Sequence, residues 1–369
     1  MKKWIAALGV LTLAVSSAQK PFDVGIIFSN SIKNDRSFNQ RTFEGVQRAS
    51  KAFGNGVKEF IPSDPTQIEV GIRKMGSDGV QLIVGVGFAS ESAISAVAKD
   101  SPNTKFAVID AVPQGSNTTG LVFREQEGSY LVGYIAGTSS STGVVGFVGG
   151  MDIPLIHKFE AGYRAGVLRA CPSCKVKSEY VGTTPSAWDD PAKAKEIAAK
   201  QVAAGADIIY AAAGASGNGA LDYVKAKLCL TVNDLPSGMR FKSNNIAAKI
   251  PKPALYSSRC QSSARPVFFI GVDSNQNYLG DTDKNPKTLN IVLTSMEKRV
   301  DNAIYAVVQA FSKGAAWRSG AVEFGLKEFG IGYAVDEYNR ALIPASLIAK
   351  IAQIKQMIVT NKIVVPTKR

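Results

Sequence analysis

Short apolar runs rich in β-branched residues alternate along the chain with longer segments that carry apolar positions at helical spacing. A first round predicts strands at 22–28, 57–61, 81–87, 105–110 and 120–123. Helical spacing and start signals such as SDP and SES predict helices over 38–53, 65–77 and 90–99. Strands and helices that alternate at this spacing are typical of a parallel sheet with right-handed crossovers.

A second round follows, with predicted strands at 143–150, 175–181, 207–214 and 267–273 and helices over 125–138, 154–170, 191–204 and 217–227. The closing part predicts a strand at 289–295, a helix over 300–313, one strand-like stretch at 324–335 and a last helix over 344–358. Two similar α/β lobes in one chain predict a cleft between them. We expect the closing part to pass back and forth between the lobes, so that a single cut does not separate them.

The first residues have the pattern of a secretory signal. Lys2 and Lys3 precede an apolar run from Trp4 to Val15, and small residues up to Ala18 follow it. The run is too short to cross a bilayer, so we expect cleavage after Ala18 rather than a membrane anchor. Because no cysteine lies near that site, a lipid anchor is not expected. We therefore expect an exported, soluble protein of the periplasm or cell envelope.

The chain is basic, with 43 Lys and Arg against 30 Asp and Glu in 369 residues and a net charge of +13. A basic balance can indicate a nucleic-acid partner. Here the basic residues are scattered and no run of five or six occurs. A generally basic exported protein is therefore the better interpretation, and no nucleic-acid partner is expected.

The chain contains four cysteines: Cys171, Cys174, Cys229 and Cys260. An even number in an oxidising compartment favours disulfides. The most economical of the three connectivities joins the first two and the last two. A zinc site is opposed by the single histidine, His157, and by the lack of a second CxxC. A redox role for the CPSC pair is a further alternative. The segment 229–266, rich in Ser, Asn, Pro and Lys, then reads as an insertion closed at its base by a disulfide.

Motifs for catalysis are missing. The sequence has no GxxxxGK[ST] loop, no HExxH and no GxSxG after a strand, and GASGNG at 214–219 lacks the full GxGxxG spacing. One histidine leaves little for acid–base chemistry near neutral pH. We expect no enzyme, no cofactor and no metal site.

Polar residues recur just past the carboxyl ends of predicted strands, at Asp35, Asp110, Asp273 and Lys298. In an open α/β sheet this edge is where ligands bind. Each residue could instead cap a helix or a turn. Four of them in one cleft would suit a ligand with several hydroxyl groups, because carboxylates accept from hydroxyls and a lysine donates to oxygen.

Two aromatic residues are candidates for stacking on a flat ring. Phe38 is followed by Asn39 in the stretch SNSIKNDRSFNQRTFEG (29–45), and Trp188 precedes a predicted helix. The alternative for Phe38 is a core side chain behind a helix cap at Ser37 or Asp35. The alternative for Trp188 is a partly buried packing residue.

Blocks throughout the chain resemble the basic membrane protein family, the substrate-binding components of ABC transporters whose best understood members are purine nucleoside receptors. The blocks are DRSFNQRTFEG (35–45), GFASESAISAVAKDSPNTKFAVID (87–110), REQEGSYLVGYIAG (124–137), FVGGMDIPLIHKFEAGYRAG (147–166), WDDPAKAKEIA (188–198), GNGAL (217–221), IGVDSNQ (270–276) and TSMEKRVDNAIY (294–305). The resemblance runs nearly end to end, apart from the insertion.

The resemblance implies a type I periplasmic-binding-protein fold, in which two doubly wound, Rossmann-like α/β lobes are joined by a three-strand hinge and hold the ligand between them. The expected lobes are 19–123 with 295–325 and 124–294 with 326–369, after a signal peptide at 1–18. The implied function is the capture of a nucleoside for a membrane permease by a monomer. The same fold with a sugar, a base or a signal molecule as its ligand is the alternative, and an exported nucleosidase is a third.

Carried over by position, Phe38 and Trp188 would stack on the two faces of a purine. Asn39 and Asp110 would bind the nucleoside, and Asp273 with Lys298 would hold the ribose hydroxyls. The full set of candidate ligand-binding residues is Ser29, Asp35, Phe38, Asn39, Asp110, Trp188, Gly214, Asp273 and Lys298. Ser29 stands where relatives commonly have an acidic residue, which leaves the preferred base open.

Overall fold

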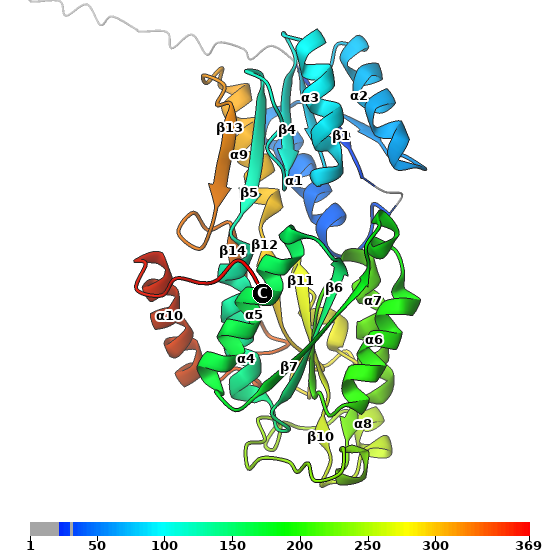
Figure 1. The fold of residues 1–369 in the computed structure, drawn as a ribbon, viewed down its shortest axis with the longest axis vertical. Helices are drawn as coiled ribbons and strands as arrows, with labels where there is room; N and C mark the ends of the chain where they lie inside the picture. The colour runs from blue at the N-terminus through cyan, green and yellow to red at the C-terminus, as the bar shows by residue number, and fades with distance from the viewer. Residues whose placement is uncertain (1–21, 30–31) are drawn as a thin grey trace, which may run out of the picture.

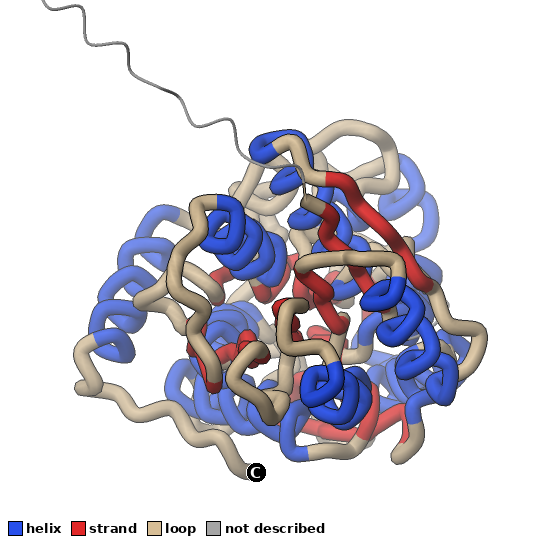
Figure 2. The backbone as a smooth tube through the Cα atoms, turned by 90° about the horizontal axis from the view of Figure 1, so that it is seen from above, coloured by secondary structure: helices blue, strands red, loops and turns tan. Residues whose placement is uncertain are grey.

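The computed structural model describes residues 22–29 and 32–369, so the predicted signal peptide lies outside the described residues. Two six-stranded sheets with helices on both faces lie one above the other along the long axis of the molecule (Figure 1). Seen from above, helices surround most of the strands (Figure 2). We call the halves built on the first and second sheet the N-terminal and C-terminal lobes.

The N-terminal lobe contains a fully parallel sheet in the order β13-β5-β4-β3-β1-β2. Its strands are β1 (Asp23–Ile27), β2 (Gly56–Phe60), β3 (Leu82–Gly85), β4 (Lys105–Ile109), β5 (Thr118–Phe123) and β13 (Gly320–Phe324). The helices are α1 (Phe38–Phe53), α2 (Ile68–Ser77), α3 (Glu91–Asp100) and α9 (Val300–Ser312). Central strands such as β3 are buried along their whole length, as a sheet covered by helices on both faces requires.

The C-terminal lobe has the order β14-β12-β11-β8-β6-β7, parallel except for the β12–β14 pair. Its strands are β6 (Val144–Met151), β7 (Lys175–Gly182), β8 (Ile208–Ala212), β11 (Phe268–Asp273), β12 (Val292–Lys298) and β14 (Ile331–Tyr333). The helices are α4 (Glu125–Ser139), α5 (Pro154–Ala170), α6 (Pro191–Ala203), α7 (Gly217–Lys227) and α10 (Ala345–Val359). Glycines let α4 and α5 pack closely, because a Cβ on Gly133 would lie 2.2 Å from the carbonyl oxygen of Tyr163.

The chain crosses between the lobes three times, after β5, after β12 and between β13 and β14. The single strand predicted at 324–335 is wrong, because a turn over 325–330 separates β13 from β14. Gly330 donates its N–H to the carbonyl of Gly325, and Glu127 accepts the N–H of Leu326. These bonds end the first strand and direct the chain into the other sheet.

The lobe boundary expected at residue 295 falls inside β12, which pairs with β11 as far as Glu297. The strand predicted at 289–295 therefore extends to Lys298, so this lysine ends the strand instead of following it. We propose that the lobe boundary lies after Lys298.

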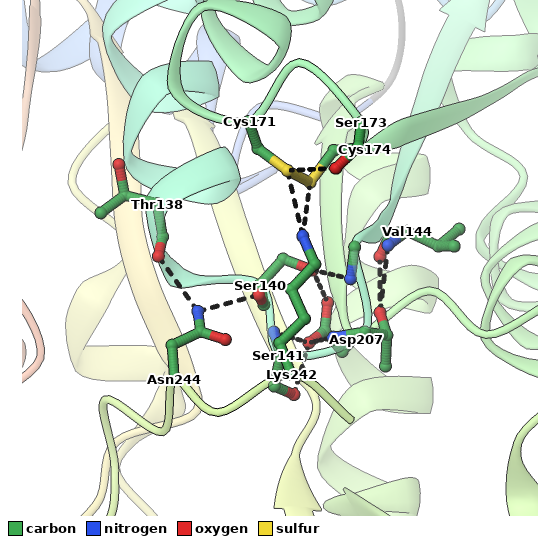
Figure 3. The surroundings of a disulfide bond; sticks show 12 residues. Thr138, Ser140, Ser141, Val144, Cys171, Ser173, Cys174, Asp207, Lys242 and Asn244 are labelled. Carbon is green, nitrogen blue, oxygen red and sulfur yellow. Dashed lines mark hydrogen bonds between the residues drawn. A yellow bond between two sulfur atoms is a disulfide. The ribbon is translucent and has the colours of Figure 1, made fainter. Parts of the chain in front are cut away.

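Both expected disulfides are present, Cys171–Cys174 and Cys229–Cys260. The insertion contains a short antiparallel pair, β9 (Cys229–Leu230) with β10 (Arg265–Pro266), and α8 (Ala254–Arg259). It lies at the end of the C-terminal lobe remote from the other lobe (Figure 1). Figure 3 shows that Lys242 of the insertion points its Nζ at the first disulfide, 3.0 and 3.2 Å from the two sulfurs. The insertion is therefore tied to the body of the lobe as well as closed on itself.

Replacing Cys229 and Cys260 together by alanine should lower the free energy of unfolding by about 3–4 kcal/mol, because the bond closes a long loop in the unfolded chain. The two cysteines are 31 residues apart, whereas Cys171 and Cys174 are 3 apart. The matched control, alanine at the second pair, should cost only about 2 kcal/mol by the same loop-length relation. Urea unfolding of both variants measures the difference. Equal losses for the two variants would contradict the dependence on loop length.

Within residues 22–29 and 32–369, none of the helices combines the length and the apolar content that crossing a membrane requires. The same ranges hold no group of three or more His, Cys, Asp or Glu side chains arranged to bind a metal ion.

Candidate ligand-binding site

A cavity of about 340 Å³ lies between the lobes, at the carboxyl ends of strands from both sheets. Residues of both lobes line it, and they include all nine candidates: Ser29, Asp35, Phe38, Asn39, Asp110, Trp188, Gly214, Asp273 and Lys298. The carboxyl ends of the parallel strands meet there, which is where open α/β sheets bind ligands. The structure thus brings together residues that are up to 269 positions apart in the chain.

Asp110 and Asp273 hold matching places in the two lobes. Asp110 follows β4 directly, and Asp273 is the last residue of β11. Both have left-handed backbones, with φ of 71° and 63°. Aspartate tolerates this conformation better than β-branched residues do, and such strained residues cluster at ligand sites.

Lys298 is the buried cation of the site, with its side chain 2% exposed. Its Nζ lies 2.5 Å from Asp110 Oδ1 and 3.0 Å from Glu125 Oε1. Glu125 is fully buried and also pairs with Lys158 at 3.2 Å. Three phenylalanine rings have their centres 5.0–5.8 Å from the same Nζ: Phe123, Phe38 and Phe159. The ammonium group thus lies among carboxylates and aromatic rings.

The pKa values follow from this burial. Burial raises the pKa of Asp273 to about 6, against the opposing effects of Lys298 and of the Ser37 hydrogen bond. Burial also raises the pKa of Asp110, although Lys298 works in the other direction. For Lys298 burial lowers the pKa, but Asp110, Glu125 and Asp273 outweigh it and the net pKa is raised. The lysine is therefore charged at neutral pH, and both aspartates are ionised above about pH 6.

Asp35 caps α1. Its Oδ1 accepts the N–H groups of Ser37 and Gln40 at 2.8 and 3.1 Å, and its Oδ2 accepts that of Asn39 at 3.0 Å. The carboxylate thereby satisfies N–H groups that the first turn of a helix leaves without partners. Asp35 lines the cavity, but its hydrogen-bonding capacity is largely used by the helix. A direct contact between Asp35 and a ligand therefore stays a prediction, and the three bonds to the helix backbone do not favour it.

Phe38 is the first residue of α1 and is half-buried against the cavity. The amide of the next residue, Asn39, donates to the carbonyl of Ile32 at 2.8 Å and so fixes the loop before the helix. Ser29 lies two residues after the end of β1 and beside Gly87, where a Cβ would be 3.4 Å from Ser29 Oγ and 3.6 Å from the Phe38 ring. A Cβ there would be in ordinary contact with both, so the glycine is favoured by its left-handed backbone, with φ of 87°, and not by a lack of space.

Trp188 comes from the opposite lobe, at the end of a short 3₁₀ turn (Pro185–Trp188). Its ring lies on Gly150, where a Cβ would approach it to 2.3 Å, and close to Gly214, where a Cβ would be 3.7 Å away. Gly214 also has a left-handed φ of 55°. Gly150 therefore makes room for the indole, whereas a Cβ on Gly214 would only be in ordinary contact with it, and Gly214 is favoured there by its left-handed backbone.

Residues 22–229 match the family model for PnrA-like ABC transporter substrate-binding proteins, named Bmp. The chain belongs to this family.

Relatives of known name agree with the family assignment. A CD4+ T-cell-stimulating antigen of Listeria monocytogenes is 30% identical, over 95% of this chain and 90% of that protein. The ABC transporter nucleoside-binding protein BmpA of Lactococcus lactis is 31% identical, over 91% of this chain and 86% of that protein. A solved ABC transporter solute-binding protein from Aeropyrum pernix K1 superposes with a TM-score of 0.73 at 26% identity, covering 94% of each chain. The predicted type I periplasmic-binding-protein fold is confirmed, and the Bmp family consists of binding proteins, not enzymes.

In this Bmp-family chain the sequence patterns missed part of the cavity wall. The patterns also missed Glu125, which pairs with Lys298 but does not line the cavity. It lies two residues after the end of β5 and obeys the same strand-end rule as Asp110, so that rule could have found it. Phe159 lies within α5 and has no signal that separates it from a core side chain. The turn after β2 adds Pro62, Ser63, Asp64 and Pro65, and the turn after β3 adds Phe88 and Ala89.

Replacing Asp273 by asparagine should stabilise the ligand-free protein more at pH 7 than at pH 4. The folded pKa of about 6 lies above the ordinary 3.8, so this carboxyl's contribution to stability is present below 3.8 and is lost as the pH rises through 6. Asparagine does not ionise. Between pH 4 and pH 7 the free energy of unfolding of the variant should therefore rise by up to about 3 kcal/mol relative to that of the wild type. Urea unfolding at several pH values measures it, with Asp222→Asn, on the exposed side of α7, as the control. Parallel pH curves for wild type and Asp273→Asn would contradict the prediction.

Proposed function

We propose that this protein captures a nucleoside, a purine nucleoside first of all, between its lobes and delivers it to a membrane permease. One observation carries the proposal. Phe38 and Trp188, from opposite lobes, line the same cavity as the charged group of Asp110, Asp273 and Lys298. Two rings from opposing walls suit the two faces of a base, and carboxylates beside a lysine suit the hydroxyls of a ribose.

The size of the cavity supports a ligand of this class. Its volume of about 340 Å³ lies at the lower end of the range of about 300–1,000 Å³ for small-molecule sites. A nucleoside-sized molecule would be enclosed there, whereas a peptide would not. The relative from Lactococcus lactis is named a nucleoside-binding protein, which agrees with this choice of ligand.

A pentose or another sugar is the second candidate, because the charged group by itself would serve hydroxyls. An arabinose-binding transporter component shares the fold at 14% identity, and that likeness concerns the fold alone. Aromatic side chains on both walls favour the nucleoside, because each stacked base face contributes about 1–3 kcal/mol.

Delivery to a permease requires an exported protein. We propose that the first 18 residues direct export and that the mature chain begins at Gln19. Mass spectrometry of the protein recovered from the cell envelope tests this, and a chain that retains Met1 would contradict it.

Isothermal titration with adenosine, guanosine, inosine, the free bases and ribose tests the ligand class. Nucleosides should bind more tightly than either a base or ribose alone, because only they use both the rings and the charged group. Binding of ribose or arabinose with no response to any nucleoside would overturn the proposal in favour of a sugar. Conversion of the added nucleoside to products, monitored by chromatography, would indicate an enzyme instead.

A further inference from the structure

The first turn of α1 is held by side chains of the opposite lobe. Residues 35–37 belong to the N-terminal lobe, and four side chains of the C-terminal lobe bond to them: Asn218, Asp273, Ser274 and Gln276. We call these residues together the interlobe latch. Its members come from three separate parts of the chain, so it exists only while the lobes are together.

The latch bonds are made mostly to backbone carbonyls. Asn218 Nδ2 donates to the carbonyl of Asp35 at 3.3 Å, and Gln276 Nε2 donates to that of Arg36 at 2.9 Å. Ser274 Oγ donates to the carbonyl of Ser37 at 3.0 Å. In the other direction, Ser37 Oγ donates to Asp273 Oδ2 at 2.7 Å. Three consecutive residues, Asp35, Arg36 and Ser37, are thus each hydrogen-bonded to the C-terminal lobe.

Most of the latch lies beside the cavity and not in its wall. Asn218, Ser274 and Gln276 are not among the residues that line the cavity. The residue that follows the gripped turn is Phe38, which does line it. Holding the turn therefore fixes the position of this ring without contact between the latch side chains and a ligand.

Asp273 joins the latch to the charged group. Its Oδ2 accepts a hydrogen bond from Ser37 Oγ. Its other oxygen, Oδ1, accepts no hydrogen bond from the described residues. Ser37 is fully buried, so this bond is shielded from water while the lobes are closed. A carboxylate that is already oriented by Ser37 needs less rearrangement to accept from a ligand hydroxyl.

We propose that the interlobe latch stabilises the closed form in the absence of ligand, and that Asn218, Ser274 and Gln276 are positioning residues for the binding of the ligand. Opening the lobes replaces the latch bonds by bonds to water, so each bond adds only its net contribution to the closed form. The latch thus raises the population of the closed form before a ligand binds. A ligand that binds the closed form then has a higher apparent affinity. The part that concerns affinity rests on the proposed nucleoside function, whereas the part that concerns closure does not.

The test combines Ser274→Ala with Asn218→Ala. Each alanine removes an interlobe bond at a residue outside the cavity wall. The matched control combines Ser258→Ala with Asn244→Ala, because these side chains donate to carbonyls within their own lobe. Small-angle scattering of the ligand-free proteins, well below their melting temperatures, reports the fraction of closed lobes.

The latch variant should have a larger radius of gyration than the wild type, and the control should match the wild type. Stopped-flow release of inosine and adenosine should be about 5–100 times faster in the latch variant, with the rate of binding nearly unchanged, because each net hydrogen bond changes an equilibrium about 2–12-fold. A variant that was merely less stable would melt earlier without either change. Identical scattering for wild type and latch variant would overturn the proposal. If neither nucleoside binds to the wild type, the proposed function fails, and the scattering still decides the latch.

Discussion

Replacing Lys298 by methionine is expected to lower the free energy of unfolding by about 3–5 kcal/mol, the usual cost of removing one partner from a buried ion pair. The lysine is the counter-ion for Asp110 at 2.5 Å and for Glu125 at 3.0 Å, and all three side chains are 6% exposed or less. Without it these carboxylates would either stay charged in a nonpolar environment or take up protons. Methionine keeps much of the side-chain length, so the loss would reflect the charge more than the packing.

The pH dependence of this variant separates charge from packing. Since the pKa of Asp110 is already raised by burial, loss of the lysine should raise it further, and the penalty should shrink as the pH falls through the range in which Asp110 protonates. Urea unfolding at pH 5 and pH 7.5 measures it. Adding Asp110→Asn should recover part of the lost stability at pH 7.5.

A second lysine offers a matched control for the first. Lys158 also pairs with Glu125, at 3.2 Å, but its side chain is 31% exposed. Lys158→Met should therefore cost less than Lys298→Met, because water can take over part of the charge. Equal costs for the two lysines, or no dependence on pH, would contradict the role of Lys298 as the counter-ion of the site.

Replacing Phe38 and Trp188 together by alanine is expected to weaken the binding of purine nucleosides at least about thirtyfold. Each stacked face contributes about 1–3 kcal/mol, so either single variant should lose about 5- to 150-fold in affinity. Both side chains are only partly buried, so the fold should survive. Isothermal titration with inosine, adenosine and guanosine measures the loss, and circular dichroism confirms the fold.

Aromatic residues outside the cavity provide the control. Phe53 lies at the other end of α1 from Phe38, and Trp317 lies in the segment before β13; neither lines the cavity. Their alanine variants should keep the wild-type dissociation constants. An unchanged dissociation constant for Trp188→Ala would remove the indole from the binding site and favour a ligand without a base.

The two predictions address different free energies. Lys298 affects both folding and binding, because a charge buried among three carboxylates is needed whether or not a ligand is present. The aromatic pair should affect binding more than folding, because both rings are only partly buried, although Phe38 also contacts Lys298 and Trp188 lies on Gly150. A variant series that shows this separation would support a cleft whose charged floor is structural as well as functional.

Much of the fold could be predicted from the sequence. The alternation of apolar strands and helices follows from local spacing, and most of the predicted strands lie within a few residues of the observed ones. Asp110 and Asp273 could be found because a polar residue at the end of an apolar strand is a local signal. The stretch 324–335 was misjudged because its apolar pattern continues through a turn that is set by Glu127, about 200 residues earlier.

The sequence by itself determined the alternating elements, the four cysteines, the strand-end polar residues and the family, because these depend on neighbours along the chain. Only the tertiary structure decided that the carboxylate of Asp35 is largely used by α1, that Lys298 pairs with Glu125 as well as Asp110, and that Ser37 bonds to Asp273 across the lobes. The physical reason is that hydrogen bonds and ion pairs depend on distances of about 3 Å between atoms. Residues far apart in the chain reach such distances only when the sheets, their helices and the three crossings are all in place.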